Sequence, residues 1–142
     1  MKIRLLLVDD EKEFVETLAE RLESRGFLVD IAYSGDEAVK KVQAKDFDVV
    51  VLDVLMPGKS GTATLRDIKV IKPISEVILL TGHATVETAI EGMKLGAYDF
   101  LMKPTEIEDL VDKIKNAYSR KAEQEERIRK ANIEQIAQRH GW

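Results

Sequence analysis

The sequence VVVLDVLMPGKSG at residues 49–61 decides the class of fold. Its first four residues are all apolar and mostly β-branched, which is typical of a short strand that is covered on both faces. Asp53 follows this run directly, and the pair Pro57 and Gly58 predicts a loop after it. Strands buried on both faces belong to parallel sheets with helices on each side. The stretch therefore predicts a carboxylate at the edge of such a sheet.

Four further short apolar runs lie elsewhere in the chain, and a helical pattern follows each run. Alternation of strand and helix over this length predicts an α/β fold, a doubly wound five-stranded parallel sheet. The four runs are residues 3–8, 28–32, 77–80 and 100–102.

Short-range signals predict where several helices begin and which face they bury. A serine or threonine three residues before a glutamate predicts a capping box, and two such pairs are Ser34 with Glu37 and Thr105 with Glu108. The helix before Gly26 is expected to bury one face at helical spacing, made of Phe14, Leu18 and Leu22.

The last helix changes character along its length. Its first part carries one apolar face, made of Ile107, Leu110, Val111, Ile114 and Tyr118. Residues 119–142 hold six Lys or Arg and four Glu, so this segment has a charge of about +2, against −6 for the rest of the chain. No helix breaker precedes Gly141. We therefore expect one domain at residues 1–118, and a charged extension at 119–142 that continues the helix.

Composition narrows the classes of function. The 142 residues fit a single domain, and cysteine is absent, which excludes disulfides and thiolate chemistry. A net charge of −4 gives no electrostatic reason to bind nucleic acid or an anionic membrane. The apolar runs are too short to span a bilayer, and the N-terminus does not resemble a signal peptide. A soluble cytoplasmic protein is expected, without direct contact to nucleic acid or membrane.

The side chains that could take part in a reaction lie at the carboxyl ends of the predicted strands. Asp9 and Asp10 follow the first strand, Asp53 the third, Thr81 the fourth and Lys103 the fifth. In an open parallel sheet these ends meet at one edge, where ligands bind. Three carboxylates there repel one another unless a hard cation such as Mg²⁺ joins them. With Mg²⁺ bound, Asp53 can act as a nucleophile on phosphorus, while Lys103 and Thr81 contact the phosphoryl oxygens.

Each of these residues taken singly has an ordinary structural explanation. An aspartate at a strand end usually caps a helix or forms a turn, and a Lys-Pro pair is a turn signal. Their joint occurrence at four strand ends favours a reactive site over a set of unrelated turns.

Four stretches of the chain match a known family: LLLVDDE at 5–11, VVVLDVLMPGKSG at 49–61, LLTGHA at 79–84 and GAYDFLMKP at 96–104. On these stretches the chain resembles the receiver domain of two-component response regulators over about residues 2–118. It looks most like receivers that precede an AAA+ activator domain of the nitrogen-regulation class. The resemblance implies the strand order 2-1-3-4-5 of the flavodoxin-like fold.

The resemblance also implies a role for each site residue. Asp53 is the implied phospho-acceptor, and a *cis* Lys103–Pro104 bond is expected to aim Lys103 at it. The implied roles of the others are metal binding by Asp9, Asp10, Asp53 and the backbone carbonyl of Leu55, phosphoryl contact by Lys103, switching by Thr81 and Phe100, and tuning of the phosphoryl lifetime by Leu55 and His83.

The implied function is a phosphorylation switch. A sensor histidine kinase or a phosphotransfer protein donates the phosphoryl group to Asp53 in a Mg²⁺-dependent reaction. The domain catalyses its own phosphorylation and dephosphorylation but serves mainly as a signalling switch. The changed surface is expected to comprise the helix before Gly96, the strand at 100–102 and the helix that follows it. A downstream partner reads this face, and a homodimer through this face or the C-terminal helix is also expected.

Three alternatives compete with this interpretation. A flavin electron carrier shares the topology, but Asp9, Asp10 and Glu11 would repel the flavin phosphate. A metal-dependent phosphatase with an aspartate nucleophile would favour a D-x-D spacing, which this first strand lacks. A degenerate receiver would act only as a phosphorylation-independent interaction module, and the intact acidic set argues against it. The sequence does not identify the kinase or the target.

Overall fold

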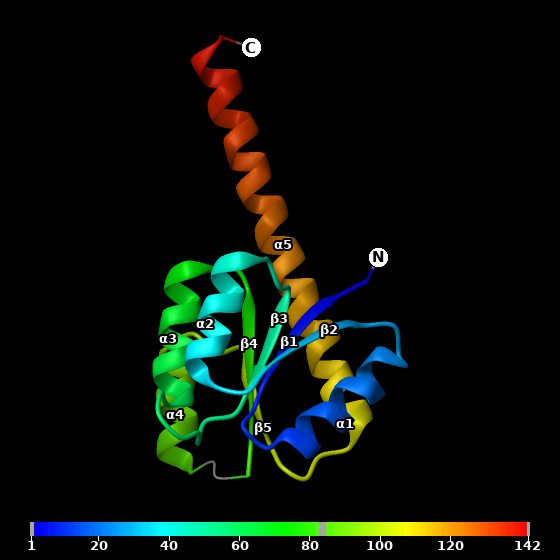
Figure 1. The fold of residues 1–142 in the computed structure, drawn as a ribbon. Coiled ribbons are helices and arrows are strands. Elements are labelled where there is room, and N and C mark those ends of the chain that lie inside the picture. Colours follow the sequence, from blue (N-terminus) through cyan, green and yellow to red (C-terminus); the bar gives the residue numbers. More distant parts are fainter. Residues whose placement is uncertain (1, 83–84, 142) are drawn as a thin grey trace.

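The computed structural model describes residues 2–82 and 85–141, which form a three-layer α/β domain (Figure 1). Within these residues there are five parallel strands in the order β2-β1-β3-β4-β5. The strands are β1 Arg4–Val8, β2 Leu28–Ala32, β3 Val49–Leu52, β4 Glu76–Thr81 and β5 Asp99–Met102. The helices are α1 Lys12–Glu23, α2 Gly35–Ala44, α3 Gly61–Ile71, α4 Val86–Lys94 and α5 Ile107–Arg139. The predicted fold class and strand order are confirmed.

Two apolar cores lie on opposite faces of the sheet. Leu5 and Leu7 of β1 point to the face covered by α1 and α5, whereas Leu6 and Val8 point to the face covered by α2 and α3. Successive side chains of a strand alternate between faces, so a strand covered on both sides must be apolar at every position. This explains why the central runs show no polar alternation, and β3 is buried along its whole length.

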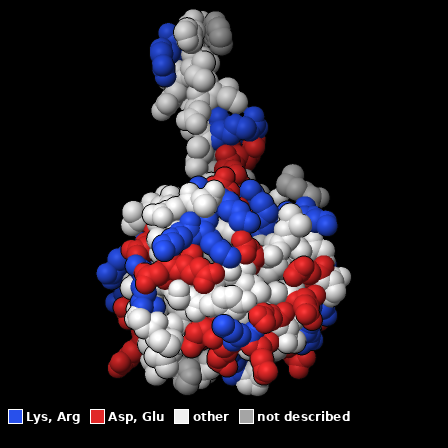
Figure 2. Space-filling model, viewed as in Figure 1, with Lys and Arg blue, Asp and Glu red and all other residues white. Residues whose placement is uncertain are grey.

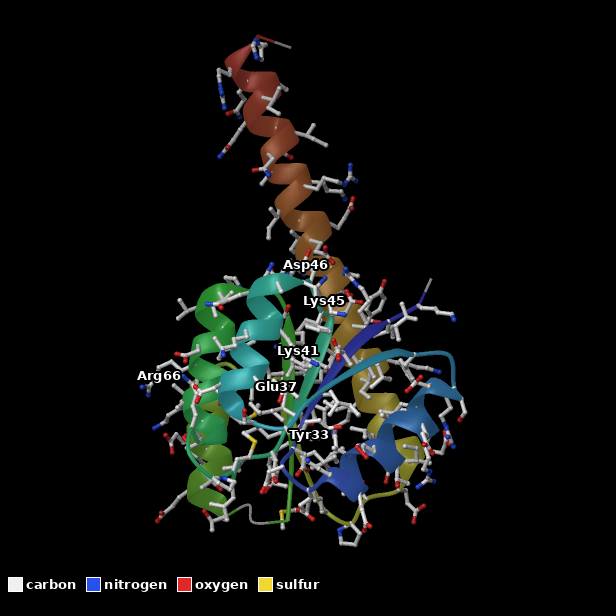
Figure 3. All side chains as sticks on the ribbon, viewed as in Figure 1. Tyr33, Glu37, Lys41, Lys45, Asp46 and Arg66 are labelled. Carbon is white, nitrogen blue, oxygen red and sulfur yellow. The ribbon has the colours of Figure 1, made fainter. Side chains whose placement is uncertain are left out.

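The edge strand β2 is held by charged side chains from α2 and its C-cap residue. Lys41 and Lys45 lie one turn apart, and their ammonium groups lie 2.8 and 3.1 Å from the Asp30 carboxylate of β2. Figure 3 shows the two lysines on the same side of α2, with Glu37 and Tyr33 further along toward the start of the helix. Charged side chains on an edge strand also discourage pairing with other chains.

One of the two predicted capping boxes is wrong and the other is partial. Ser34 caps α2 by accepting a hydrogen bond from the Glu37 N–H at 3.1 Å, but the Glu37 carboxylate accepts from the Tyr33 N–H instead of closing the box. The helix α5 has Glu106 at its N-cap, not Thr105. The carboxylate of Glu108 pairs with Arg25 at 2.7 Å, so it is engaged by the turn after α1 and not by its own helix end. A complete box occurs between Thr85 and Thr88, which the glutamate-based pattern did not predict.

The buried faces of α1 and α5 differ slightly from the prediction. Leu18 and Leu22 are buried as expected, but Phe14 is only partly buried and Val15 fills the core in its place. On α5, Tyr118 is partly buried, and Ala117 takes the fully buried position. Large aromatic rings at the rim of a helix face keep one side in solvent, whereas smaller neighbours fit the close contact with the sheet.

The helix α5 has 33 residues and projects far beyond the globular body (Figure 1). It runs through the expected boundary at 118/119 without interruption. Two cations just past this point hold it to the sheet, because Arg120 pairs with Glu76 and Lys121 pairs with Asp48. Beyond Lys121 almost every described residue is exposed, and Figure 2 shows mixed charges along the projecting segment. Among the described residues, no helix is both long and apolar enough to cross a membrane.

Candidate functional site

Three carboxylates meet at the carboxyl ends of β1 and β3. Asp9 and Asp53 are almost fully buried, with exposed fractions of 4% and 3%, whereas Asp10 is exposed. One oxygen from each of the three lies within 4.8 Å of the others. The backbone fixes two of these positions, because Asp9 N–H donates to the Ala32 carbonyl and Asp53 N–H to the Val8 carbonyl. A cluster with only oxygen donors fits a hard divalent cation such as Mg²⁺.

The pKa of Asp9 reflects its burial and its repulsion by a neighbouring carboxylate. Burial raises the pKa of Asp9, and hydrogen bonds from Lys103 and the Glu11 N–H oppose this rise without cancelling it. The neighbouring charge of Asp53 also raises the pKa of Asp9. A cation bound among the carboxylates would remove this repulsion.

Lys103 brings a positive charge into the acidic cluster from the end of β5. Its ammonium nitrogen lies 2.6 Å from Asp9 Oδ2 and 3.6 Å from Asp53 Oδ2. Burial lowers the pKa of Lys103, but the hydrogen bond to Asp9 and the charges of Asp9 and Asp53 outweigh burial and leave the pKa raised. The Lys103 N–H donates to the Thr81 carbonyl at 2.9 Å, and the Lys103–Pro104 bond is *cis*, as expected.

The predicted site residues Thr81 and Leu55 lie at and beyond the carboxyl ends of the neighbouring strands β4 and β3. Thr81 ends β4 and is fully buried. The Leu55 N–H donates to Asp53 Oδ1 at 3.3 Å, while the Leu55 side chain is 59% exposed. Gly61 closes the loop after β3, and a Cβ there would meet the Asp53 carbonyl at 2.2 Å, so only glycine fits. His83 lies outside the described residues.

Phe100 lies in β5 and is partly buried against the core on the α2 and α3 side of the sheet. Its ring also lines an apolar groove together with residues of α4, namely Val86, Ala89, Ile90 and Met93. Val86 is 77% exposed and Ile90 50% exposed, so this part of the α4 and β5 surface is apolar and open to solvent.

Two further residues of the site were not predicted. The carboxylate of Glu11 lies 3.3 Å from the Lys103 ammonium, and the Phe14 ring centroid lies 4.2 Å from it. Phe14 was expected in the core because its spacing matches the buried face of α1. No sequence signal distinguishes a core aromatic from one that faces a lysine 89 positions away in the chain.

The family model of the response regulator receiver domain matches residues 5–115. The chain belongs to this family. The receiver domain is 39% identical over 116 residues to the transcriptional regulatory protein ZraR of *Salmonella typhimurium*, which covers 82% of this chain and 26% of ZraR. It is 35% identical over 118 residues to an NtrX-like response regulator of *Rickettsia felis*, covering 82% of this chain and 25% of that protein. The chain therefore spans about a quarter of the length of these two relatives.

Solved structures of receiver domains share this fold. A CheY-like receiver domain from *Methanospirillum hungatei* is 28% identical, with a TM-score of 0.84 over 87% of this chain and 99% of that one. NtrX from *Brucella abortus* is 30% identical, with a TM-score of 0.83 over 89% of this chain and 29% of that one. A *Burkholderia pseudomallei* response regulator with a phosphorylated aspartic acid and a calcium ion is 28% identical, with a TM-score of 0.77 over 99% of this chain and 86% of that one.

Proposed function

We propose that this receiver domain accepts a phosphoryl group on Asp53 from a sensor histidine kinase or a phosphotransfer protein. The observation that carries the proposal is a buried Asp53 carboxylate with an ammonium group 3.6 Å away and two further carboxylates within 4.8 Å. The phosphorylated aspartic acid of the *Burkholderia* protein supports the same chemistry on a similar fold. We also propose a cytoplasmic location for this protein, in keeping with phosphorylation by such a kinase.

In the proposed reaction an Asp53 oxygen attacks phosphorus, the new P–O bond forms, and the bond from phosphorus to the donor breaks. Asp9, Asp10, Asp53 and the Leu55 carbonyl would hold Mg²⁺, which supplies charge neutralisation for the phosphoryl oxygens when bound. Lys103 neutralises a further part of this charge, and the Thr81 hydroxyl donates a hydrogen bond to one oxygen. The buried position of Asp53 keeps bulk water away from the carboxylate before transfer.

The proposed test is intact-mass spectrometry after incubation with acetyl phosphate. We expect a phosphoryl mass increase only with Mg²⁺ present, and peptide mapping should assign it to Asp53. Chelation of Mg²⁺ is the matched control. A protein that is never labelled, with either acetyl phosphate or kinase phosphohistidine, would instead support a phosphorylation-independent interaction module.

Phosphorylation is proposed to change the face formed by α4, β5 and α5. Thr81 would move toward the phosphoryl oxygen, and Phe100 would turn inward and alter the exposed apolar surface of α4. Beryllofluoride, a phosphoryl mimic, is expected to shift the NMR signals of Phe100, Ile90 and Met93 more than those of α2. Unchanged signals on this face at saturating beryllofluoride would contradict the switching model.

The extension at 119–142 is proposed as a segment distinct from the receiver body at 1–118, and one that contributes to a homodimer. The projecting helix exposes Ile128, Ile133 and Ile136, with exposed fractions of 47%, 51% and 45%. Such side chains on an otherwise polar helix favour a partner helix. Sedimentation velocity at high protein concentration is expected to detect dimers, and a monomer in both the free and the beryllofluoride-bound protein would contradict this.

Leu55 is proposed to slow loss of the phosphoryl group. Its side chain lies two positions after Asp53, cannot hydrogen-bond, and can exclude water from the line of attack. Leu55→Asn is expected to speed dephosphorylation by up to about tenfold, a barrier change of about 1.4 kcal/mol. The rate is measured at fixed Mg²⁺ and pH, with Val70→Asn as an exposed apolar control on α3. Equal rates for Leu55→Asn and the parent would exclude this role.

A further inference from the structure

The Lys103 ammonium has an aromatic neighbour in addition to its carboxylates. Its nitrogen lies 4.2 Å from the Phe14 ring centroid, well inside the range in which a cation is attracted by the face of a ring. The Lys103 side chain is only 13% exposed, so this attraction is weakly screened by water. Phe14 and Lys103 also line the same apolar groove of about 440 Å³ between α1 and the start of α5.

Phe14 packs against the core from outside the fully buried face of α1. The buried face of this helix is made of Val15, Leu18, Ala19 and Leu22, and Phe14 lies at its edge, partly exposed. A leucine at this position would supply comparable apolar bulk. The feature that only an aromatic ring supplies is its negatively polarised face, directed at the ammonium.

The contact with the Phe14 ring matters because several carboxylates compete for the Lys103 ammonium. The ammonium has three carboxylates nearby, at 2.6 Å from Asp9, 3.3 Å from Glu11 and 3.6 Å from Asp53. The carboxylate of Glu11 is exposed and competes with Asp9 and Asp53 for the same ammonium. A neutral ring attracts the cation without binding Mg²⁺ or repelling a phosphoryl group, so it can hold the ammonium in the site throughout the reaction.

We propose that Phe14 is a positioning residue for phosphoryl transfer, whose ring holds the Lys103 ammonium beside Asp53. This inference rests on the proposed function of Asp53. It adds α1 to the elements that build the site, through a side chain and not only through the acidic loop that precedes the helix.

The experiment compares Phe14→Leu, which removes the ring, with Phe14→Tyr, which keeps it. Labelling rates are measured with acetyl phosphate and Mg²⁺, because this small donor needs no protein docking surface. Phe14→Leu is expected to slow labelling by about three- to fivefold, and Phe14→Tyr is expected to retain the parent rate. Chemical unfolding of each variant checks that the protein is folded during the assay.

A second measurement is independent of phosphorylation. In the unphosphorylated parent and in Phe14→Tyr, the ring current should shift the NMR signals of the Lys103 ε-protons upfield, and Phe14→Leu should remove the shift. Labelling of Phe14→Leu at the parent rate, equal slowing in both variants, or unshifted ε-protons in the parent would overturn the inference while leaving the proposed function intact. A parent protein that is not labelled would overturn the proposed function itself.

Discussion

Replacing Asp53 with asparagine is expected to abolish phosphoryl labelling of this receiver domain. The amide is neither an anion nor a useful nucleophile, and it removes one of three carboxylates that can hold Mg²⁺. The variant should remain folded, because the substitution keeps the side-chain shape and removes a charge that raises the pKa of Asp9. Intact mass after incubation with acetyl phosphate and Mg²⁺ is the measurement.

Asp46→Asn is the matched control for this prediction. Asp46 lies in the loop before β3, is exposed, and pairs with Lys72 at the opposite end of the sheet from the acidic cluster. The control should be labelled like the parent. Full labelling of Asp53→Asn on another residue would show that Asp53 is not the acceptor.

The second large effect is expected at Asp48, in a buried ion network at the amino ends of the strands. Asp48 is 4% exposed and accepts hydrogen bonds from the Arg4 N–H at 2.8 Å, the Arg4 guanidinium at 2.9 Å and the Lys121 ammonium at 3.0 Å. The Lys121 side chain is only 6% exposed. The carboxylate therefore joins β1, the start of β3 and the point where α5 leaves the globular body.

Asp48→Ala is expected to lower the free energy of unfolding by about 3–5 kcal/mol, because it leaves the Lys121 charge buried without this partner. Among the residues that the structure describes, the other ion pair of Lys121 is with Glu125, which lies one turn along the same helix. Glu126→Ala is the control, since its exposed pair with Arg129 should contribute at most about 0.5 kcal/mol. Urea unfolding measures both. Equal losses of unfolding free energy in the two variants would mean that the buried Asp48 network stabilises the fold no more than an exposed ion pair does.

The same network predicts a pH dependence of stability. Burial raises the pKa of Asp48, but hydrogen bonds from Arg4 and Lys121 outweigh it and leave the pKa lowered. A lowered carboxyl pKa stabilises the folded state above the unfolded value of about 3.9, and this contribution is lost as the pH falls through the folded pKa. Between pH 6 and about pH 3, Asp48→Asn should lose less stability than the parent. An identical pH profile would contradict the sign of this shift.

Much of the fold and the acidic site could be predicted from the sequence because the signals are local. Unbroken apolar runs such as residues 49–52 require cover on both faces, and a parallel sheet provides it. The polar residue that ends each run then lies at one edge of the sheet. This pattern predicts Asp9, Asp53 and Lys103 at one site. In the structure the Lys103 ammonium lies 2.6 Å from Asp9 and 3.6 Å from Asp53, and oxygens of the two carboxylates lie within 4.8 Å of each other.

Only the tertiary structure decided which partner each charged or aromatic side chain takes. The sequence predicts that the Lys103 side chain points at Asp53. In the structure the Lys103 ammonium lies closer to Asp9, 94 positions away in the chain, and over the ring of Phe14. Likewise, Asp48 joins Arg4 and Lys121 across separations of 44 and 73 residues. Periodicity reports whether a side chain faces the core or the solvent. The direction of a long, flexible side chain depends on the charges and rings that packing brings within its reach, and those belong to other elements of the chain.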